Sequence, residues 1–296
     1  MNRKLPDSDT FESNRRLLFS IAYRMLGSAM EAEDMVQEAY LRYQRSADSS
    51  DEPIQFPKAY LTTIITRLCL DQLKSAKTRR EEYVGTWLPE PIATDGAPGA
   101  ALVERETISM AFLVLLESLT PMERAVFLLR EVFDYDYAEI APIVGKSEAN
   151  CRRYYHRARQ FLTERRPRFE PSTDEQNKLL EAFMQVVVAG DVQGLTDLLA
   201  EDVAVYGDGG GKVPSAPRPV QGRKAVIKLI MGSIRLITSD MRIEIKEVNG
   251  APSVLYWTNG SLTGVFNFAI AQSHIVAIHS IFNPDKLAYL EQHGGL

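Results

Sequence analysis

The 296-residue sequence predicts a multi-domain protein, in which two all-α modules are followed by a C-terminal α+β domain. Up to about residue 165, apolar residues recur at three- and four-residue steps, which is the spacing of amphipathic helices. From residue 174, helical stretches give way to alternating strands separated by Asn-Gly pairs, which favour two-residue hairpin turns. Helices followed by a run of strands are typical of an α+β domain.

Composition excludes several classes of protein. The chain is 45% hydrophobic and 25% charged, which argues against a disordered or fibrous chain. Cys69 and Cys151 lie outside any CxxC or Cys/His motif, so neither a disulfide framework nor a zinc site is predicted. The uncharged stretch Val248–Pro284 contains many polar residues and predicts strands, not a membrane helix. We therefore expect a cytoplasmic protein without a cofactor, a metal or membrane association.

The first eighty residues predict three helices. Gly27-Ser28 ends the first helix, and the polar stretch Ser46–Pro57 forms a loop after the second. The third helix begins near Lys58 and ends in the charged run Lys77–Glu82.

Residues 83–106 predict a linker. The prolines of WLPEP (87–91) and the glycines of TDGAPGA (94–100) disfavour a helix. Residues 81–109 carry a net charge of −5, so the linker is acidic.

The second all-α module is predicted from helix-capping residues. Thr120-Pro121-Met122-Glu123 is a capping box with proline at the first helical position. A second helix, about Tyr137–Val144, ends at Gly145, and Ser147 caps a third helix from Glu148 to about Arg165. Because residues 146–168 carry a net charge of +6, this order predicts a helix-turn-helix with a basic second helix.

The C-terminal domain is divided by its glycines. Gly190 separates two helices over 175–200, and a short strand at Val203–Tyr206 precedes the glycine run 207–212. A further helix spans about Arg223–Ile237. Strands are predicted at 241–248, 253–258, 261–271 and 274–282, as an antiparallel meander that forms a curved sheet.

Three surfaces carry patterns that suit a macromolecular partner. The basic helix presents cations to DNA phosphates and its first residues to base edges, unless it is only a solvated helix. Its candidate residues are Lys146, Ser147, Glu148, Asn150, Arg152, Arg153 and Arg157. Aromatic and basic residues beside the polar loop suit single-stranded DNA, although Tyr60 fits a core position equally well. These residues are Phe56, Lys58, Tyr60, Arg67, Lys74, Lys77, Arg79 and Arg80. A mostly acidic helical face with Asp34, Gln37 and Glu38 is either solvated or suited to a basic protein.

No catalytic residue is predicted. The run GDGGGK (207–212) fails the phosphate-loop pattern, because Tyr206 replaces a glycine and Val213 replaces Ser or Thr. Its glycines instead predict a tight loop with positive φ at a strand end. Asp208, Tyr206, His274 and His279 leave a general base conceivable, but their spacing matches no catalytic signature.

Several of these segments resemble a known family. Residues 18–43 (LFSIAYRMLGSAMEAEDMVQEAYLRY) and 56–83 (FPKAYLTTIITRLCLDQLKSAKTRREEY) resemble region 2 of extracytoplasmic function (ECF) sigma factors. Residues 119–159 (LTPMERAVFLLREVFDYDYAEIAPIVGKSEANCRRYYHRAR) resemble their region 4, and about 174–296 resemble the SnoaL-like fold, a ketosteroid-isomerase-type cone. WLPEP (87–91), DGGGK (208–212) and NPDKL (283–287) together resemble the subgroup with a fused SnoaL-like extension.

The resemblance implies four parts: region 2 at 8–83, an acidic linker at 84–106, region 4 at 107–168 and a SnoaL-like regulatory domain at 174–296. It implies a chain that binds core RNA polymerase and promoter DNA and starts transcription without being an enzyme. The acidic face would dock on the polymerase clamp. The loop before Phe56 and the helix through Arg80 would melt and read the −10 element, and the basic helix would read −35. The linker would enter the RNA channel. We expect a monomer when free, and a small-molecule ligand of the C-terminal domain stays open.

We further expect the three signature segments to meet in one regulatory contact. In it, Trp87 is buried against another domain, and Lys212 and Lys286 pair with Glu90. The alternative is that Trp87 only anchors the linker on region 2. The residues expected in the contact are Trp87, Leu88, Pro89, Glu90, Pro91, Asp208, Gly209, Gly210, Gly211, Lys212, Asn283, Pro284, Asp285 and Lys286.

Two other functions remain open on the sequence. The chain could be a helix-turn-helix repressor with a small-molecule sensor domain, although a repressor has no use for a DNA-melting module. It could also be a SnoaL-like isomerase or cyclase tethered to DNA.

Overall fold

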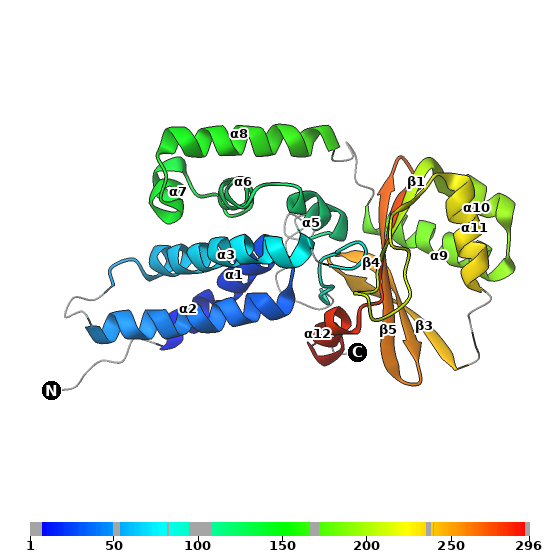
Figure 1. Ribbon diagram of the computed structural model, residues 1–296, viewed down its shortest axis with the longest axis horizontal. Helices are drawn as coiled ribbons and strands as arrows, with labels where there is room; N and C mark the ends of the chain where they lie inside the picture. The colour runs from blue at the N-terminus through cyan, green and yellow to red at the C-terminus, as the bar shows by residue number, and fades with distance from the viewer. Residues whose placement is uncertain are drawn as a thin grey trace. The chain divides into compact units, whose positions relative to one another are not determined.

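The computed structural model describes residues 8–49, 54–81, 83–94, 108–165, 172–234, 238 and 240–293. The chain forms two compact units (Figure 1). The helical unit contains residues 1–81 and 115–165, and the C-terminal unit contains residues 82–114 and 166–296. We call residues 82–109, which follow the third helix, the connector.

The helical unit confirms the all-α prediction for the first half of the chain. Gly27 has φ 69° and ends the first helix, as predicted. A five-residue π-helix, which the sequence did not predict, continues the helix that starts at the Thr120 capping box. The helices are α1 (Ser8–Leu26), α2 (Ala29–Ser49), α3 (Pro57–Glu81), α6 (Pro121–Phe127), η1 (Leu128–Val132), α7 (Tyr137–Val144) and α8 (Glu148–Arg165). Helix α5 (Met110–Glu117) lies at the boundary between the two units.

Helices of both predicted sigma modules contact each other within the helical unit. On α3, Thr62 shares a buried hydrogen bond of 2.9 Å with the hydroxyl of Tyr135. Arg67 donates to the carbonyl oxygens of Pro142 and Ile143 at the end of α7, at 2.7 and 3.0 Å. The last carbonyl groups of a helix have no N–H partner within the helix, so they need a donor from elsewhere. Arg67 supplies this donor for two carbonyls of α7.

A buried arginine joins the same modules at another point. Arg124 of α6 is 2% exposed, pairs with Glu117 at 2.6 Å, and donates to the carbonyl oxygen of Met25 at 2.6 Å. Burial lowers the pKa of Arg124 to about 9, which still leaves the side chain cationic at neutral pH. The cation therefore fixes the end of α1 to the start of the helix-turn-helix.

The C-terminal unit is an α+β domain built on one six-stranded sheet, in the order β2-β1-β6-β5-β4-β3. The sheet is mixed rather than wholly antiparallel, because β1 pairs with β6 in parallel. The predicted antiparallel meander is confirmed for β3 to β6. After the crossover through α11, β3 runs antiparallel to β1. Three hairpin turns follow, so β6 runs parallel to β1. The strands are β1 (Leu199–Asp208), β2 (Val220–Gln221), β3 (Met241–Val248), β4 (Ala251–Thr258), β5 (Ser261–Ala271) and β6 (His274–Ile281).

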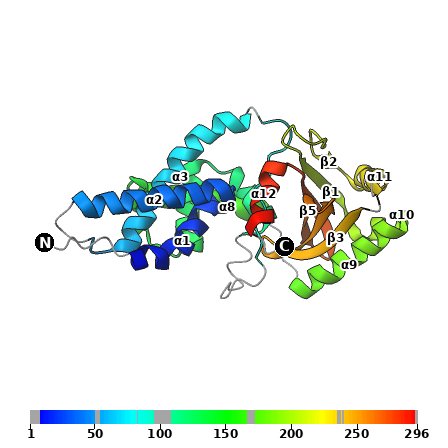
Figure 2. The same ribbon diagram turned by 90° about the horizontal axis from the view of Figure 1, so that it is seen from below.

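The two faces of this sheet have different covers (Figures 1 and 2). One face packs against helices α9 (Thr173–Ala189), α10 (Val192–Leu198) and α11 (Arg223–Ser233). The other face packs against Leu88 of the connector, Met110 of α5, and helix α12 (Pro284–His293). The helix-covered core is apolar, with Leu180, Phe183, Val205, Val226 and Ile278 among its buried side chains. The connector is thus part of the second core of the C-terminal unit.

Candidate nucleic-acid interface and connector contact

Helix α8 presents the predicted DNA-contacting residues to solvent. Cys151, Ala158 and Leu162 are buried and anchor one face of the helix. Ser147 accepts a hydrogen bond from the backbone N–H of Asn150 at 3.3 Å and caps the helix as predicted. On the other faces of the helix, Asn150, Arg152, Arg153 and Arg157 are exposed and Glu148 is half-buried, and Lys146 and Ser147 just before the helix are also exposed.

The three candidate arginines of this helix, Arg152, Arg153 and Arg157, differ in what they contact. Arg152 pairs with Glu148 at 2.8 Å, and its guanidinium lies 5.0 Å from the centre of the Tyr137 ring. Arg157 is 3.7 Å from a Glu123 carboxylate oxygen. Arg153 makes no ion pair with any residue that the structure describes, and helical geometry places it about 160° from Cys151 around the axis. Arg153 therefore projects from the centre of the solvent face.

An aromatic cluster around Tyr155 holds α8 against its neighbouring helices. Tyr155 stacks on Phe127 with a ring separation of 6.2 Å and meets Tyr137 edge-on at 6.1 Å. Its hydroxyl donates to the Glu131 carboxylate, and burial together with that carboxylate raises the pKa of Tyr155 to about 12. The tyrosine hence stays a neutral donor and ties α8 to η1.

The aromatic and basic candidates around α3 are divided between exposed and engaged side chains. Phe56, just before α3, is 73% exposed, and Lys58 is also exposed. Tyr60 is half-buried and shares a hydrogen bond with Ser46, which fits the core alternative that the sequence left open. Arg67 is held by the carbonyls of α7, as described above. Lys74 is exposed and pairs with Asp71 at 2.8 Å, while the side chains of Lys77, Arg79 and Arg80 lie outside the described residues.

A cavity of about 390 Å³ lies beside Phe56 within the helical unit. It is lined on one side by the residues that open α3, including Phe56 and Lys58, and on the other by Phe133, Tyr135 and Glu139. The exposed aromatic predicted to stack on a base thus lies next to the loop between η1 and α7.

The acidic face of α2 is exposed and has apolar neighbours. Asp34 and Gln37 are exposed, and Glu38 pairs with Arg42 at 2.8 Å. Met30 and Leu41, which the sequence analysis missed, are 51% and 44% exposed. Positions 30, 34, 37 and 41 share one helical face, so the signal was their three- and four-residue spacing.

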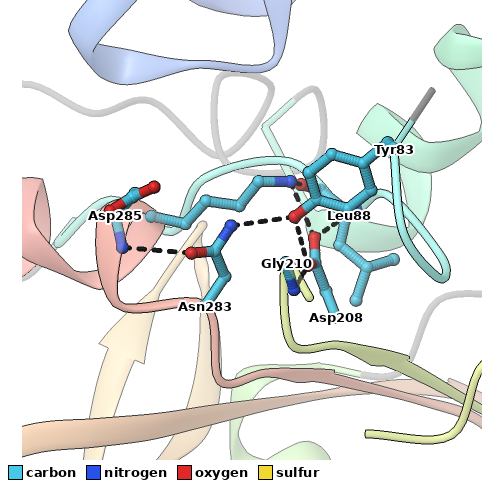
Figure 3. A network of polar contacts seen from close by, with 7 residues as sticks. Tyr83, Leu88, Asp208, Gly210, Asn283 and Asp285 are labelled. Atoms are coloured by element: carbon cyan, nitrogen blue, oxygen red, sulfur yellow. Dashed lines mark hydrogen bonds and ion pairs between the residues drawn. The ribbon is translucent and has the colours of Figure 1, made fainter. Parts of the chain in front are cut away.

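The signature segments of the C-terminal unit meet at a buried carboxylate (Figure 3). Asp208 is fully buried at the end of β1. Its oxygens accept hydrogen bonds from the backbone N–H of Leu88 at 2.8 Å, the hydroxyl of Tyr83 at 2.5 Å, and the N–H of Gly210 at 3.1 Å. Lys286 of α12 completes the set at 2.7 Å. We call Tyr83, Trp87, Leu88, Asp208, Asn283 and Lys286 the hub.

Lys286 is the second charge of the hub. Its side chain is 7% exposed, and besides Asp208 it donates to the carbonyl oxygen of Leu88. Its ammonium lies 4.1 Å from the centre of the Trp87 ring and 4.9 Å from that of Tyr83. The lysine pairs with Asp208, and Lys212 pairs with Asp285 at 2.7 Å, where the sequence analysis proposed Glu90 for both. Pro89, Glu90 and Pro91 are buried next to Leu88.

The glycine loop leaves room for the Asn283 side chain and for a tight turn of its own backbone. Gly210 and Gly211 have φ 62° and 70°, as predicted for a tight loop at a strand end. A Cβ on Gly210 would lie 2.3 Å from the Asn283 amide, and one on Gly209 would lie 2.0 Å from the carbonyl oxygen of Val213. The Asn283 amide in turn donates to the hydroxyl of Tyr83 at 2.8 Å. Asn283 would be displaced by any larger residue at position 210.

Sequence reasoning missed two residues that hold the connector. Tyr83 gave no local signal, because its partners Asp208 and Asn283 are far away in the chain; burial and the Asp208 carboxylate raise its pKa. Asn249, at the β3–β4 turn, was interpreted only as a turn residue, yet its side chain is fully buried. Its amide forms hydrogen bonds with the connector backbone at Ile92 and Ile108.

The residues weighed for catalysis form no acid–base pair. Asp208 is saturated by four donors, from Tyr83, Leu88, Gly210 and Lys286. His279 is 3% exposed and stacks on Tyr206 at 5.3 Å, and burial lowers the pKa of His279 to about 4. His274 is exposed at the other end of β6. Among the described residues, no helix is long and apolar enough to cross a membrane, and no three His, Cys, Asp or Glu side chains group as metal ligands.

Comparisons with known proteins define the class to which these modules belong. Residues 10–79 match the Sigma-70 region 2 family, and residues 109–162 match the Sigma-70, region 4 family. The module that contains α1 to α3 and the helix-turn-helix of α6 to α8 are therefore the two promoter-recognising modules of a sigma factor.

Whole-chain relatives specify the family further. The chain is 38% identical over 294 residues to the ECF RNA polymerase sigma factor SigJ of Mycobacterium tuberculosis, covering 93% of this chain and 91% of SigJ. It is 31% identical to the probable ECF sigma factor SigI of the same organism, over 97% of each chain. The crystal structure of SigJ superposes with a TM-score of 0.76 at 33% identity, covering 95% of this chain and 98% of that one. The chain belongs to the ECF RNA polymerase sigma factor family, and its promoter recognition and transcription initiation follow from the two sigma regions.

Proposed function

We propose that the chain docks on core RNA polymerase through the acidic face of α2 and reads a two-element promoter with α3 and α8. The observation that carries this assignment is the division of exposed charge within the helical unit. Asp34 and Gln37 are exposed on α2, and the cations Arg152 and Arg153 of α8, with Lys146 just before it, are exposed as well. Carboxylates suit a basic protein surface and arginines suit phosphates and guanine edges.

The two reading modules have to separate when both promoter elements are bound. Elements at −10 and −35 are about 25 base pairs apart, which at roughly 3.4 Å per pair is about 85 Å. A compact unit of about 130 residues has a radius of gyration of only about 14 Å. The contacts of Thr62 with Tyr135 and of Arg67 with the α7 carbonyls are short-range and cannot persist across that distance.

We propose that the C-terminal unit regulates this separation through the connector. The connector joins α3 to α5, and the hub ties Leu88 and Trp87 to Asp208 and Lys286. Any force that draws the modules apart acts on this connector, so hub strength sets part of the free energy of opening. A ligand of the C-terminal unit could act by the same route.

The C-terminal unit is proposed to be non-catalytic. The core between its sheet and helices α9 to α11 is apolar, and Asp208 already accepts from four donors. A tethered isomerase or cyclase needs a free general base in such a core. A substrate turned over by the wild-type chain but not by Asp208→Asn would contradict this part of the proposal.

Run-off transcription with core polymerase tests the proposed function. The full-length chain should start transcription at a two-element promoter, and Trp87→Ala should change its output without abolishing polymerase binding. Lys212→Ala is the control, because the Lys212–Asp285 pair lies on the exposed rim of the same contact. Equal output from wild type and Trp87→Ala would reject regulation through the hub, and no transcript from the wild type would reject the proposed docking and promoter-reading surfaces.

A further inference from the structure

The connector is fastened to the C-terminal unit at a second place, apart from the hub. The residues Ile92, Ala93 and Thr94 lie along the end of β3, where Ala93 forms an antiparallel bridge with Val248. The N–H of Thr94 donates to the carbonyl oxygen of Glu247 at 3.3 Å. This part of the connector therefore pairs with the edge strand β3 through an isolated bridge.

The β3–β4 turn holds both arms of the connector through one side chain. The Asn249 amide oxygen accepts from the N–H of Ile92 at 3.3 Å, and its amide nitrogen donates to the carbonyl oxygen of Ile108 at 3.0 Å. The backbone N–H of Asn249 also donates to the carbonyl oxygen of Ile92 at 2.9 Å. Next to it, the N–H of Gly250 donates to the hydroxyl of Thr94 at 2.9 Å.

The geometry of this turn goes beyond what a hairpin needs. Asn249 is fully buried and has φ 54°, whereas Asn259 at the β4–β5 turn has φ 51° and is exposed. Both positions use an Asn-Gly pair to provide a left-handed backbone. Since only Asn249 uses its amide to bind two distant segments, its side chain serves a purpose apart from the turn.

We propose that the β3–β4 turn is a docking site for the connector, and that Asn249 clamps its two arms by holding Ile92 and Ile108 close together. The two hydrogen bonds to one amide keep the N–H of Ile92 and the carbonyl oxygen of Ile108 within about 9 Å of each other. Released and extended, the same stretch of chain can span about 50 Å. The clamp thus removes most of the connector's reach.

This inference rests on the proposed function, because a shortened connector matters only if the two sigma modules separate. A separation of about 85 Å between promoter elements needs more chain length than the connector offers while Ile92 and Ile108 are held together. Opening of the clamp therefore accompanies promoter binding, together with opening of the hub, because Leu88 and Met110 on either side of the clamp pack in the same core.

The test compares Asn249→Gly with Asn259→Gly in the full-length chain. Glycine keeps the left-handed turn at both sites, so only the side chain is lost. Hydrogen exchange of the backbone around Ile92 and Thr94 should become about tenfold faster in Asn249→Gly, as expected for the loss of about two hydrogen bonds, and stay unchanged in Asn259→Gly. In run-off transcription with core polymerase, Asn249→Gly should raise output severalfold over both wild type and the control.

Each outcome decides one part of the proposal. Unchanged exchange around Ile92 in a folded Asn249→Gly variant overturns the docking site. Faster exchange with unchanged transcription overturns the role of the clamp in limiting reach. Should Asn249→Gly fail to fold, Thr94→Val removes the hydroxyl that accepts from Gly250 and must give the same two results. If the wild type starts no transcription, the proposed function fails, while the exchange experiment still decides whether Asn249 docks the connector.

Discussion

Helix α8 and the hub of the C-terminal unit use charged residues in opposite ways. On α8 the cations are exposed, and the Arg152–Glu148 pair joins neighbours four residues apart with side chains 56% and 44% exposed. In the hub, Asp208 and Lys286 come from distant strands and helices, and their side chains are 0% and 7% exposed. The exposed charges of α8 are available to a binding partner, whereas the buried charges of the hub interact only within the protein.

The energetics of the two arrangements differ accordingly. An exposed ion pair contributes about 0–1 kcal/mol, since water and salt screen it. A buried pair stabilises little compared with an apolar replacement, but removal of one partner leaves an uncompensated buried charge, at a cost of about 3–5 kcal/mol. Substitutions in the hub should therefore affect stability most, and substitutions on α8 and α2 should affect binding.

The largest effect is expected from Lys286→Met. This change leaves the Asp208 carboxylate buried with neutral donors only, so the free energy of unfolding of the C-terminal unit should fall by about 3–5 kcal/mol. Denaturant unfolding followed by tryptophan fluorescence measures it. Lys212→Met, at the exposed Lys212–Asp285 pair, is the matched control and should lose less than about 1 kcal/mol.

A double variant sharpens this result. In Asp208→Asn/Lys286→Met both charges are gone, so the loss should be smaller than in Lys286→Met alone. If the double variant is less stable by the sum of the two single losses, the two residues do not act as a pair.

The sequence predicted much of the α-helical structure because its signals are local. The capping box at Thr120 and the left-handed Gly145 mark helix ends that the structure confirms within a residue or two. Strand direction is different: the parallel pairing of β1 with β6 depends on a crossover through α11, and no local alternation encodes it. The predicted β1, Val203–Tyr206, was too short, because the outer residues of the strand pair with β6, which is distant in the chain.

The contacts of the connector were predictable only in part. That the three signature segments belong together came from the resemblance to a family, and the structure brings them into contact. The carboxylate with which each lysine pairs depends on contacts between residues far apart in the chain, so Asp208 and Asp285 were not predicted as the partners. Asn249 was missed for a related reason, since an Asn-Gly pair indicates a turn whether or not the amide is used elsewhere.

The second effect concerns His279, on the same sheet face as the hub. Burial lowers the pKa of His279 to about 4, below the usual value of 6.5. The unfolded chain then binds a proton that the folded chain does not, so stability is lost as pH falls from about 6.5 towards 4, by about 2–3 kcal/mol. Urea unfolding at pH 7 and pH 4.5 measures this loss.

A variant isolates the contribution of this histidine. His279→Phe keeps the stacking on Tyr206 but cannot be protonated, so its loss of stability in acid should be smaller than that of the wild type by about 2–3 kcal/mol. His274→Phe, at an exposed position of the same strand, should lose as much as the wild type. Equal acid losses in all three proteins would show that protonation of His279 does not limit stability.

The third effect separates two neighbouring arginines of α8. Arg153 points away from the domain, so Arg153→Ala should cost about 1–3 kcal/mol of promoter binding, concentrated at one base pair of the −35 element. Arg152 must leave Glu148 and Tyr137 to reach a base. Arg152→Ala should therefore weaken binding to all DNA sequences alike, and the slope of log affinity against log salt concentration should fall in size by about one. Holoenzyme binding to promoters with single base changes measures both. A base-specific loss in Arg152→Ala with a uniform loss in Arg153→Ala would reverse the assignment.

The smallest effect is expected on the exposed acidic face of α2, where solvent screens each charge. Asp34→Lys combined with Glu38→Lys should weaken binding to core polymerase about tenfold at low salt, and the difference should shrink as salt rises. Asp71→Lys, on the exposed surface of α3, is the control and should bind as the wild type does. A difference that persists at high salt would mean that Met30 and Leu41, the exposed apolar residues on the same helical face, supply more of the contact than the carboxylates. Binding of the double variant at the wild-type level would place the polymerase contact on another surface of the chain.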